Sequence, residues 1–184
     1  MLVLASSSPQ RRAMLERLGV SFLQRPSGID ELAQGDPGAI ALENALRKAR
    51  AAVVPDAEEA VLGCDTLVAL GGVVYGKPAD ESAARETLGG LSGATHEVVS
   101  GLALLLEGSP ARTAVARTSV TFRVLSEELL DWYLAGGEWR GRAGGYAIQG
   151  AGAALVRSVH GDYENVVGLP LATLLDLYPE LLSR

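Results

Sequence analysis

The chain has 184 residues, and its 48% apolar and 21% charged residues give the balance of a folded globular protein rather than a disordered one. The formal net charge of −6 disfavours nonspecific nucleic-acid binding, although a few local cations can still make one cleft positive. No apolar run reaches the roughly 18 residues of a membrane span, and Cys64, the only cysteine, excludes an internal disulfide and fits a reducing cytoplasm.

The first predicted elements are a strand, a serine-rich turn and a helix. Residues 1–5 are apolar but too short for a signal peptide, so they are typical of a buried strand. Ser8 is the expected N-cap of the helix that follows, with Pro9 as its first residue and Gly19 as its stop. A helix that begins in such a turn offers free backbone N–H groups to an anion.

The later predicted elements alternate between helices and strands. A second helix begins at Asp36-Pro37, and its apolar stripe is expected at Leu42, Leu46, Ala49 and Val53. Further along we expect a buried strand over 61–70 with a short pairing arm over 73–75, followed by a helix over 80–88 that Gly89-Gly90 ends. Paired strands are expected over 96–106 and 114–124. The last expected elements are a helix after Ser126, a strand over 155–159 and a helix over 171–182. This mixed order predicts an α/β or α+β fold.

Several common motifs of nucleotide-binding proteins and hydrolases are missing. The sequence contains no G-x-x-x-x-G-K-[ST] phosphate loop, no G-x-G-x-x-G, no H-E-x-x-H and no G-x-S-x-G. His96 and His160 are too few to build a His-rich metal site. These absences disfavour a P-loop kinase, a Rossmann enzyme, a zinc metalloprotease and an ordinary α/β-hydrolase.

Asp65 is the strongest single candidate for a functional residue. It interrupts an apolar strand, where a carboxylate is costly unless it is paired, hydrogen-bonded or bound to a metal. Thr66 beside it supplies a hydroxyl, and Lys77 lies in a rigid Gly-Lys-Pro turn just beyond the strand pair. Lys48 and Glu31, taken alone, are equally well explained as surface residues.

Two further segments place polar side chains next to a helix end or a loop. Ser6, Ser8, Arg11 and Arg12 lie around the first turn, and they are either parts of a capped helix with solvated arginines or a cradle for a phosphate. The glycine-rich stretch 143–150 is either a flexible loop or a segment that approaches a ligand closely, with Gln149 pairing the edge of a base. The residues alone leave both choices open.

Taken together, these segments resemble the Maf family of nucleotide pyrophosphatases, also described as septum-formation-inhibitor-like. The match runs in order along nearly the whole chain. Its segments are residues 4–11 (LASSSPQR), 30–31 (DE), 48–49 (KA), 63–66 (GCDT), 76–78 (GKP), 91–93 (LSG) with His96, 143–150 (AGGYAIQG) and 165–170 (NVVGLP). Each segment is weak alone, but their order and spacing are highly specific.

The resemblance implies a fold and a reaction. The implied fold is a single α/β domain over residues 1–184, with an elongated mixed sheet, helices and two lobes around a central cleft, similar to inosine-triphosphate pyrophosphatases. The implied reaction is attack by water between the α- and β-phosphates of a nucleoside triphosphate, which yields a monophosphate and pyrophosphate. A divalent cation, Mg²⁺ or Mn²⁺, is the implied cofactor.

Family roles carry over only to matching positions of this sequence. The implied catalytic residues are Asp65 as general base with Glu31, Lys48 and Lys77 as its charged partners. The implied substrate contacts are Ser6, Gln10, Arg11, Thr66 and Gln149. The implied metal ligands are Glu31 and Asp65, so that Asp65 acts as base, ligand or both.

The substrate branch is implied by residues 146–149, whose version here resembles the branch acting on dTTP and UTP rather than the one acting on 7-methyl-GTP. Gln10 departs from both branches, since the first usually has arginine there and the second tryptophan. That position is associated with substrate choice, so the departure leaves the base preference open.

Other implications concern the cellular location, oligomeric state, partners and cellular role of the protein. The resemblance implies a cytoplasmic homodimer without nucleic-acid or membrane partners, a part in clearing non-standard nucleotides and a link to arrest of cell division. The alternative from another class is a non-catalytic nucleotide-binding regulator of septum formation. A buried Asp65 with Lys77 nearby favours the enzyme, because binding alone needs no base.

Overall fold

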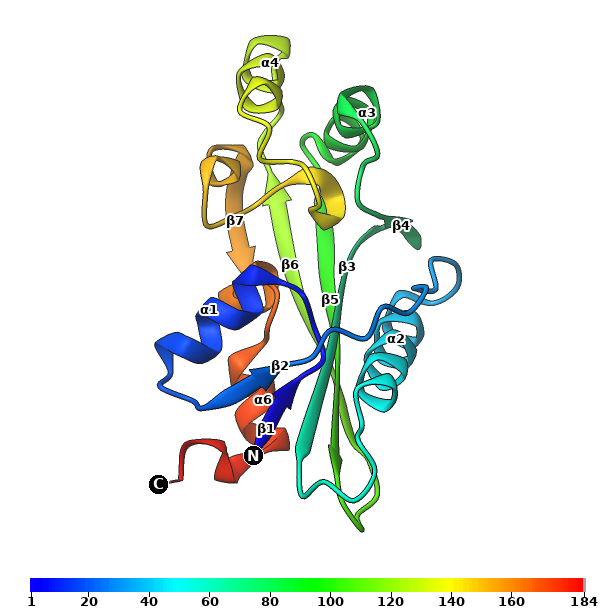
Figure 1. Ribbon diagram of the computed structural model, residues 1–184. Helices are drawn as coiled ribbons and strands as arrows, with labels where there is room; N and C mark the ends of the chain where they lie inside the picture. Colours follow the sequence, from blue (N-terminus) through cyan, green and yellow to red (C-terminus); the bar gives the residue numbers. More distant parts are fainter. Residues whose placement is uncertain (184) are drawn as a thin grey trace.

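The computed structural model describes residues 1–183, in which seven strands form one mixed sheet (Figure 1). The strands are β1 (Leu2–Leu4), β2 (Phe22–Gln24), β3 (Ala60–Leu70), β4 (Val73–Tyr75), β5 (Thr95–Leu106), β6 (Arg112–Phe122) and β7 (Val156–His160). Their order is β2-β1-β3-β5-β6-β7, with β4 paired to β3. β1 pairs in parallel with β2 and β3, while β3, β5, β6 and β7 form antiparallel pairs. The predicted mixed α/β architecture is therefore confirmed.

The helices are α1 (Pro9–Arg17), α2 (Pro37–Ala51), α3 (Glu81–Leu91), α4 (Glu127–Ala135), α5 (Tyr163–Val167) and α6 (Leu171–Leu177). Short 3₁₀ turns span Ala143–Gly145, Ala151–Leu155 and Pro179–Leu182. Figure 1 shows an elongated molecule, with α3 and α4 at one end of the long strands and α1, α2 and α6 around the other. Within residues 1–183, no helix has both the length and the hydropathy to cross a membrane.

Helices cover both faces of the sheet at the end that holds the N-terminus. Successive side chains of a strand point to opposite faces, so Leu2 and Leu4 pack with α1 and α6 while Val3 packs with α2. The same alternation in β3 directs Asp65 toward α2 and its neighbour Thr66 toward α1, where Arg11 contacts it.

The approach of α2 to the sheet is unusually close because β3 and β5 present glycines to it. A β-carbon added at Gly63 would lie 2.0 Å from the carbonyl oxygen of Ala45, and one at Gly101 would lie 2.2 Å from that of Ala41. Small residues on both sides therefore let the helix backbone rest on the strands. This contact brings the polar side chains of α2 within reach of β3.

The start and stop signals predicted from the sequence are largely confirmed. Ser8, Asp36 and Ser126 are the N-caps of α1, α2 and α4, and each accepts a hydrogen bond from a backbone N–H three residues on. The predicted pairing of the two longest antiparallel strands, β5 and β6, is also observed.

Three predicted details are wrong. Gly89 and Gly90 do not end α3, which continues to Leu91 because Leu91, like Leu88, is fully buried in the core. The predicted final helix over 171–182 is broken at Tyr178, whose backbone is not helical, since the following Pro179 disfavours the helical conformation before it.

The third wrong detail is the buried face of α2. Leu42 and Leu46 are only partly buried and Val53 lies exposed beyond the helix end. Ala49 is buried as predicted, and the other buried side chains belong to Ile40, Ala41, Asn44, Ala45 and Lys48. The alanines fit against the glycines of the sheet, and Asn44 and Lys48 contact Asp65.

The packing of α2 gives a prediction about stability. Gly63→Ala is expected to lower the free energy of unfolding by about 1–3 kcal/mol or more, because the new β-carbon forces α2 away from β3. Gly89→Ala is the matched control, since no atom lies within 4 Å of its added β-carbon and alanine favours the helix. Urea denaturation measures both. Equal midpoints for the two variants would contradict the close packing.

Candidate active site

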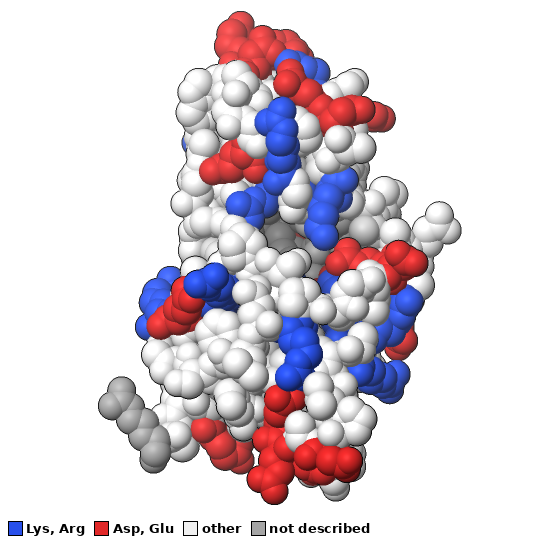
Figure 2. Space-filling view, in the orientation of Figure 1, with Lys and Arg blue, Asp and Glu red and all other residues white. Residues whose placement is uncertain are grey.

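The protein contains a cleft of about 510 Å³. It is lined by the turn between β1 and α1, residues 26–29 and 31, Lys48, the middle of β3, Lys77, Val98, residues 140–143, 146, 147 and 149, and residues 166–168. In Figure 2, Lys and Arg side chains border the hollow in the middle of the visible face. All nine predicted site residues line this cleft: Ser6, Gln10, Arg11, Glu31, Lys48, Asp65, Thr66, Lys77 and Gln149.

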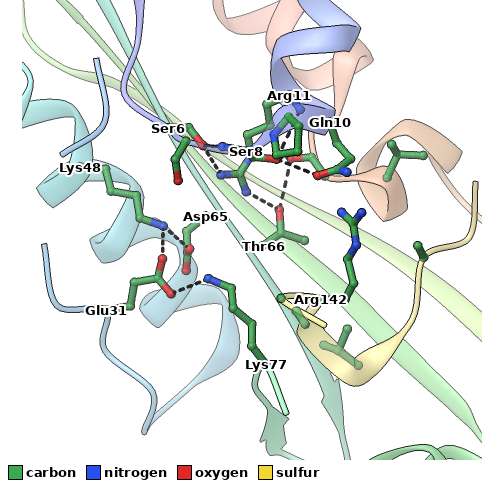
Figure 3. Close-up of a pocket in the computed structure, with 18 of the residues that line it drawn as sticks. Ser6, Ser8, Gln10, Arg11, Glu31, Lys48, Asp65, Thr66, Lys77 and Arg142 are labelled. Carbon is green, nitrogen blue, oxygen red and sulfur yellow. Dashed lines mark hydrogen bonds and ion pairs between the residues drawn. The ribbon is translucent and has the colours of Figure 1, made fainter. Parts of the chain in front are cut away.

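The centre of the site is a buried ion pair between α2 and β3. Asp65 is 3% exposed and Lys48 is 8% exposed. The Lys48 ammonium donates to Asp65 Oδ1 over 2.6 Å and to Glu31 Oε1 over 2.6 Å. Lys77 Nζ lies 3.4 Å from Glu31 Oε2. The two lysines and two carboxylates thus form one continuous chain of contacts (Figure 3).

Asn44 completes this cluster, and the sequence analysis missed it. Its side-chain amide donates to Asp65 Oδ2 over 2.9 Å. The same side chain exchanges hydrogen bonds with the backbone N–H and C=O of Leu32, which anchors the loop that carries Glu31. Asn44 precedes Lys48 by four residues, so both project from one face of the helix. The sequence signal that could have identified Asn44 is its position four residues before Lys48, which puts two polar side chains on the face of the helix that turns toward the sheet.

Arg11 forms a second cluster on the other side of β3. Its guanidinium donates to Ser6 Oγ over 3.0 Å, to Thr66 Oγ1 over 3.0 Å and to the Gly168 carbonyl over 2.8 Å. All three acceptors are uncharged, so the charge of Arg11 is not neutralised by a carboxylate. The predicted grouping of Ser6 with Arg11 is therefore observed, and Thr66 joins it.

The N-terminus of α1 supports this cluster. Ser8 Oγ accepts from the backbone N–H of Arg11 and donates to Gln10 Oε1. The capped-helix interpretation is thus correct in its geometry, and the same turn also faces the cleft.

The glycine-rich segment forms the opposite wall of the cleft. Gln149 lies exposed on it, and Tyr146 and Ala147 are buried beneath. Gly144 takes a positive φ of 66° and lies directly against Val68, so a side chain there would clash with β3. Its N–H donates to the Gly76 carbonyl, which joins this wall to the turn that carries Lys77.

Two arginines of this wall were also missed by the sequence analysis. Figure 3 shows Arg142 directed into the cleft, opposite Asp65 and Lys48. Within residues 1–183, neither Arg140 nor Arg142 forms an ion pair, and Arg142 Nε is buried without a hydrogen-bond partner. Arg140 lies over the ring of Trp139. Arg140 and Arg142 are far from the other cleft cations along the chain, so no sequence pattern indicated that they belong to the same site.

The cleft is positive although the chain is acidic overall. Its lining contains five cationic side chains (Arg11, Lys48, Lys77, Arg140 and Arg142) against the carboxylates of Glu31 and Asp65. This leaves an excess of three positive charges inside a protein of net charge −6. A cleft with this lining attracts a small polyanion.

Glu31 and Asp65 were tested as a site for a divalent cation. Within residues 1–183, no three His, Cys, Asp or Glu side chains converge as a metal site. Mg²⁺ nevertheless binds through one or two carboxylates when substrate phosphates and waters complete its shell. Each carboxylate here accepts one hydrogen bond per oxygen, so lone pairs remain available. The donor set therefore fits a cation that arrives with a phosphate ligand.

Known proteins resemble this chain in sequence over most of its length. The sequence model of the Maf-like protein family matches residues 1–181. The chain belongs to the Maf-like family. Among curated members, the dTTP/UTP pyrophosphatase of Pyrococcus furiosus is 42% identical over 96% of this chain and 93% of its own length. That of Moorella thermoacetica is 47% identical over 96% of this chain and 92% of its own. Among solved structures, the Staphylococcus aureus Ham1 protein overlaps 66% of this chain and 71% of its own, with 16% identity and a TM-score of 0.47.

The charged cluster of this Maf-like chain gives a prediction about titration. Partial burial opposes the charge of Glu31, but the hydrogen bond and charge of Lys48, and then those of Lys77, hold the pKa of its carboxyl below its usual range. A lowered pKa means that Glu31 contributes stability above its ordinary pKa, and that this contribution is lost as pH falls through the folded pKa. Lys48→Met is expected to raise the pKa of Glu31 more than Lys77→Met does.

The measurement is an NMR titration of the Glu31 carboxyl carbon in the folded variants. Arg50→Met, on the exposed side of α2, is the matched control and should leave the pKa of Glu31 in place. If Lys48→Met behaves like this control, Lys48 does not hold the charge of Glu31.

Proposed function

We propose that this protein hydrolyses nucleoside triphosphates, with dTTP and UTP as preferred substrates, to a nucleoside monophosphate and pyrophosphate. The observation that carries the proposal is the buried Asp65, held by Lys48 and Asn44 at the edge of a cleft with an excess of positive charge. The names of the curated relatives, dTTP/UTP pyrophosphatases over nearly their whole length, support the same reaction.

Asp65 acts as the general base in this proposal. Two donors fix both of its oxygens, which holds the carboxylate in one orientation. The carboxylate takes a proton from water as the water oxygen bonds to the α-phosphorus. The bond from that phosphorus to the bridging oxygen breaks, and the electron pair leaves with pyrophosphate. Lys48 and Asn44 keep the base in place for this step.

The cationic side chains stabilise the charge that builds on the leaving pyrophosphate. Arg11 contacts only neutral acceptors, and Arg142 has no ion pair within the described residues, so both are available to phosphate oxygens. Arginine is well suited to this contact because its fork matches two phosphate oxygens. Lys77 is held at the cleft by Glu31 and supplies a further charge.

Glu31 and Asp65 would hold the divalent cation, Mg²⁺ or Mn²⁺, together with substrate phosphate oxygens. When bound, the cation supplies positive charge where the scissile phosphates meet the carboxylates. Lys48 and Lys77 offset part of the charge of the two carboxylates, and the cation would offset the rest where the carboxylates face phosphate oxygens. The pair of carboxylates next to cationic walls is therefore consistent with metal-assisted hydrolysis.

Gln149 selects the base in this proposal. Uracil and thymine present an N–H flanked by carbonyls, and a terminal amide pairs with one of each. A site built to pair these groups rejects a base that leaves them unpaired. Gln10 lies at the opposite wall and replaces a cation with a neutral amide, which weakens electrostatic selection at that position.

The proposal also covers the domain organisation, cellular location, partners and cellular role of the protein. We take the chain as one domain, because all strands of residues 1–183 join one sheet. A free, buried Cys64 fits a cytoplasmic location, and the net charge disfavours nucleic-acid partners. A homodimer and a role in clearing non-standard nucleotides are proposed from the family resemblance alone. The alternative of a non-catalytic regulator is disfavoured, because nucleotide binding gains nothing from burying the Asp65 carboxylate.

The role of Asp65 is tested by Asp65→Asn. The exchange keeps the shape of the side chain and removes the base, so pyrophosphate release from dTTP should fall by about 10³-fold or more while circular dichroism stays unchanged. Asp176→Asn, an exposed change on α6, is the control and should keep full activity. A folded Asp65→Asn variant with near-normal turnover would exclude Asp65 as the base.

The role of Gln149 is tested by ranking kcat/KM for dTTP, UTP, CTP, GTP and 7-methyl-GTP. The native protein should prefer dTTP and UTP, with 7-methyl-GTP poor. Gln149→Ala should compress this ranking by about tenfold, the value of one hydrogen bond to the base. A ranking led by 7-methyl-GTP, or one that Gln149→Ala leaves unchanged, would refute base selection by Gln149 without affecting the assignment of the reaction.

A further inference from the structure

We propose that Glu138 is a positioning residue for substrate selection, which holds the turn that carries Gln149. This inference rests on the proposed function. Glu138 does not line the cleft. It lies just after α4, half-buried, and its carboxylate faces the backbone of residues 150–152.

The contacts of Glu138 are made with backbone amides directly after Gln149. One carboxylate oxygen accepts from the N–H of Ala151 over 3.1 Å and the other from the N–H of Gly152 over 2.8 Å. These N–H groups open the short 3₁₀ turn over Ala151–Leu155, which has no cap of its own. A carboxylate bonded to two N–H groups is a strong, charge-assisted contact, so it fixes the backbone just beyond Gln149.

Gly150 lets the carboxylate approach this closely. A β-carbon added at Gly150 would lie 1.8 Å from Glu138 Oε1. The φ of Gly150 is −122°, so this glycine is not required by a left-handed backbone conformation. The space that Glu138 occupies is therefore one reason for glycine at this position.

The other side of Gln149 is fixed by residues of α4 and β5. The N–H of Ala147 donates to the hydroxyl of Tyr133 over 3.3 Å, and the Tyr146 hydroxyl lies 2.9 Å from His96 Nε2. The N–H of Gly150 donates to the carbonyl of Ala147 and closes the turn. Gln149 thus lies on a turn that is held on both sides, and its side chain is left exposed at the cleft.

Such a turn is what base selection requires. A flexible Gln149 would follow any base and pair with many, whereas a fixed amide pairs only with a base whose polar groups meet it. Glu138 is the charged member of the set that holds the turn, and its loss removes two hydrogen bonds at once. Selectivity is therefore expected to depend on Glu138 although Glu138 touches no substrate.

The test measures equilibrium binding, so that it does not depend on turnover. The probes are α,β-methylene-UTP and α,β-methylene-GTP, in which carbon replaces the bridging oxygen, and calorimetry gives the ratio of their dissociation constants. Glu138→Gln keeps the shape but turns one acceptor into a donor that faces an N–H group. We expect the preference for the uracil analogue to fall about tenfold. Glu127→Gln, in the first turn of α4, removes an exposed carboxylate and should leave the ratio unchanged.

A double-mutant cycle with Gln149→Ala separates positioning from general stability. If Glu138 acts through Gln149, Glu138→Gln causes no further loss of preference once Gln149 is gone. A purely structural role would lower the melting temperature and weaken both analogues equally, with the ratio intact. An unchanged ratio in folded Glu138→Gln, additive losses in the cycle, or equal binding of both analogues by the native protein would each overturn the proposal.

Gly150→Ala provides an independent route if Glu138→Gln does not fold. Its new β-carbon must displace the Glu138 carboxylate, so it should cause the same loss of uracil preference, and an unchanged ratio would count against the proposal. A failure of the proposed reaction can be told apart from a failure of this inference. If the native protein prefers the uracil analogue but releases no pyrophosphate from dTTP or UTP, the hydrolysis is wrong while the role of Glu138 stands.

Discussion

The buried carboxylate of Asp65 determines how α2 must lie on the sheet. A carboxylate with 3% exposure is costly unless charged and polar partners surround it. Both partners, Lys48 and Asn44, come from one face of α2. Removal of one partner of a buried ion pair costs about 3–5 kcal/mol, so the helix and the strand are tied together at this point. Glycines at positions 63 and 101 supply the space that this contact needs.

The same contact organises the loop before α2. Asn44 bonds the backbone of Leu32, and Lys48 bonds Glu31 in that loop. A segment without regular structure is thereby fixed against a helix. Lys77, from the turn after β4, completes the set through Glu31. Residues from four separate parts of the chain therefore meet because one buried charge requires partners.

Strand β3 separates the site into two chemical environments. Asp65 faces Asn44 and Lys48 of α2, with Glu31 and Lys77 next to them, whereas Thr66 faces Arg11 and neutral oxygens. The alternation of side chains along a strand makes this separation automatic. In the proposed reaction, a triphosphate that spans the cleft would meet the paired carboxylates and lysines on one side of β3 and Arg11 on the other.

The sequence by itself determined most of the elements, several of the helix caps and the nine predicted residues that line the cleft, whereas β2 and α5 were not predicted. Ser8, Asp36 and Ser126 cap helices through local hydrogen bonds, and Asp65 stands out because a carboxylate in an apolar strand is locally anomalous. Only the tertiary structure decided the face that α2 buries, the continuation of α3 through Gly89, and the surroundings of Asn44, Arg142 and Glu138. These depend on partners far along the chain: the glycines beneath α2, the core that holds Leu91, the cleft opposite Asp65 and the backbone amides after Gln149. Local patterns cannot encode such contacts, because they form only when distant segments pack together.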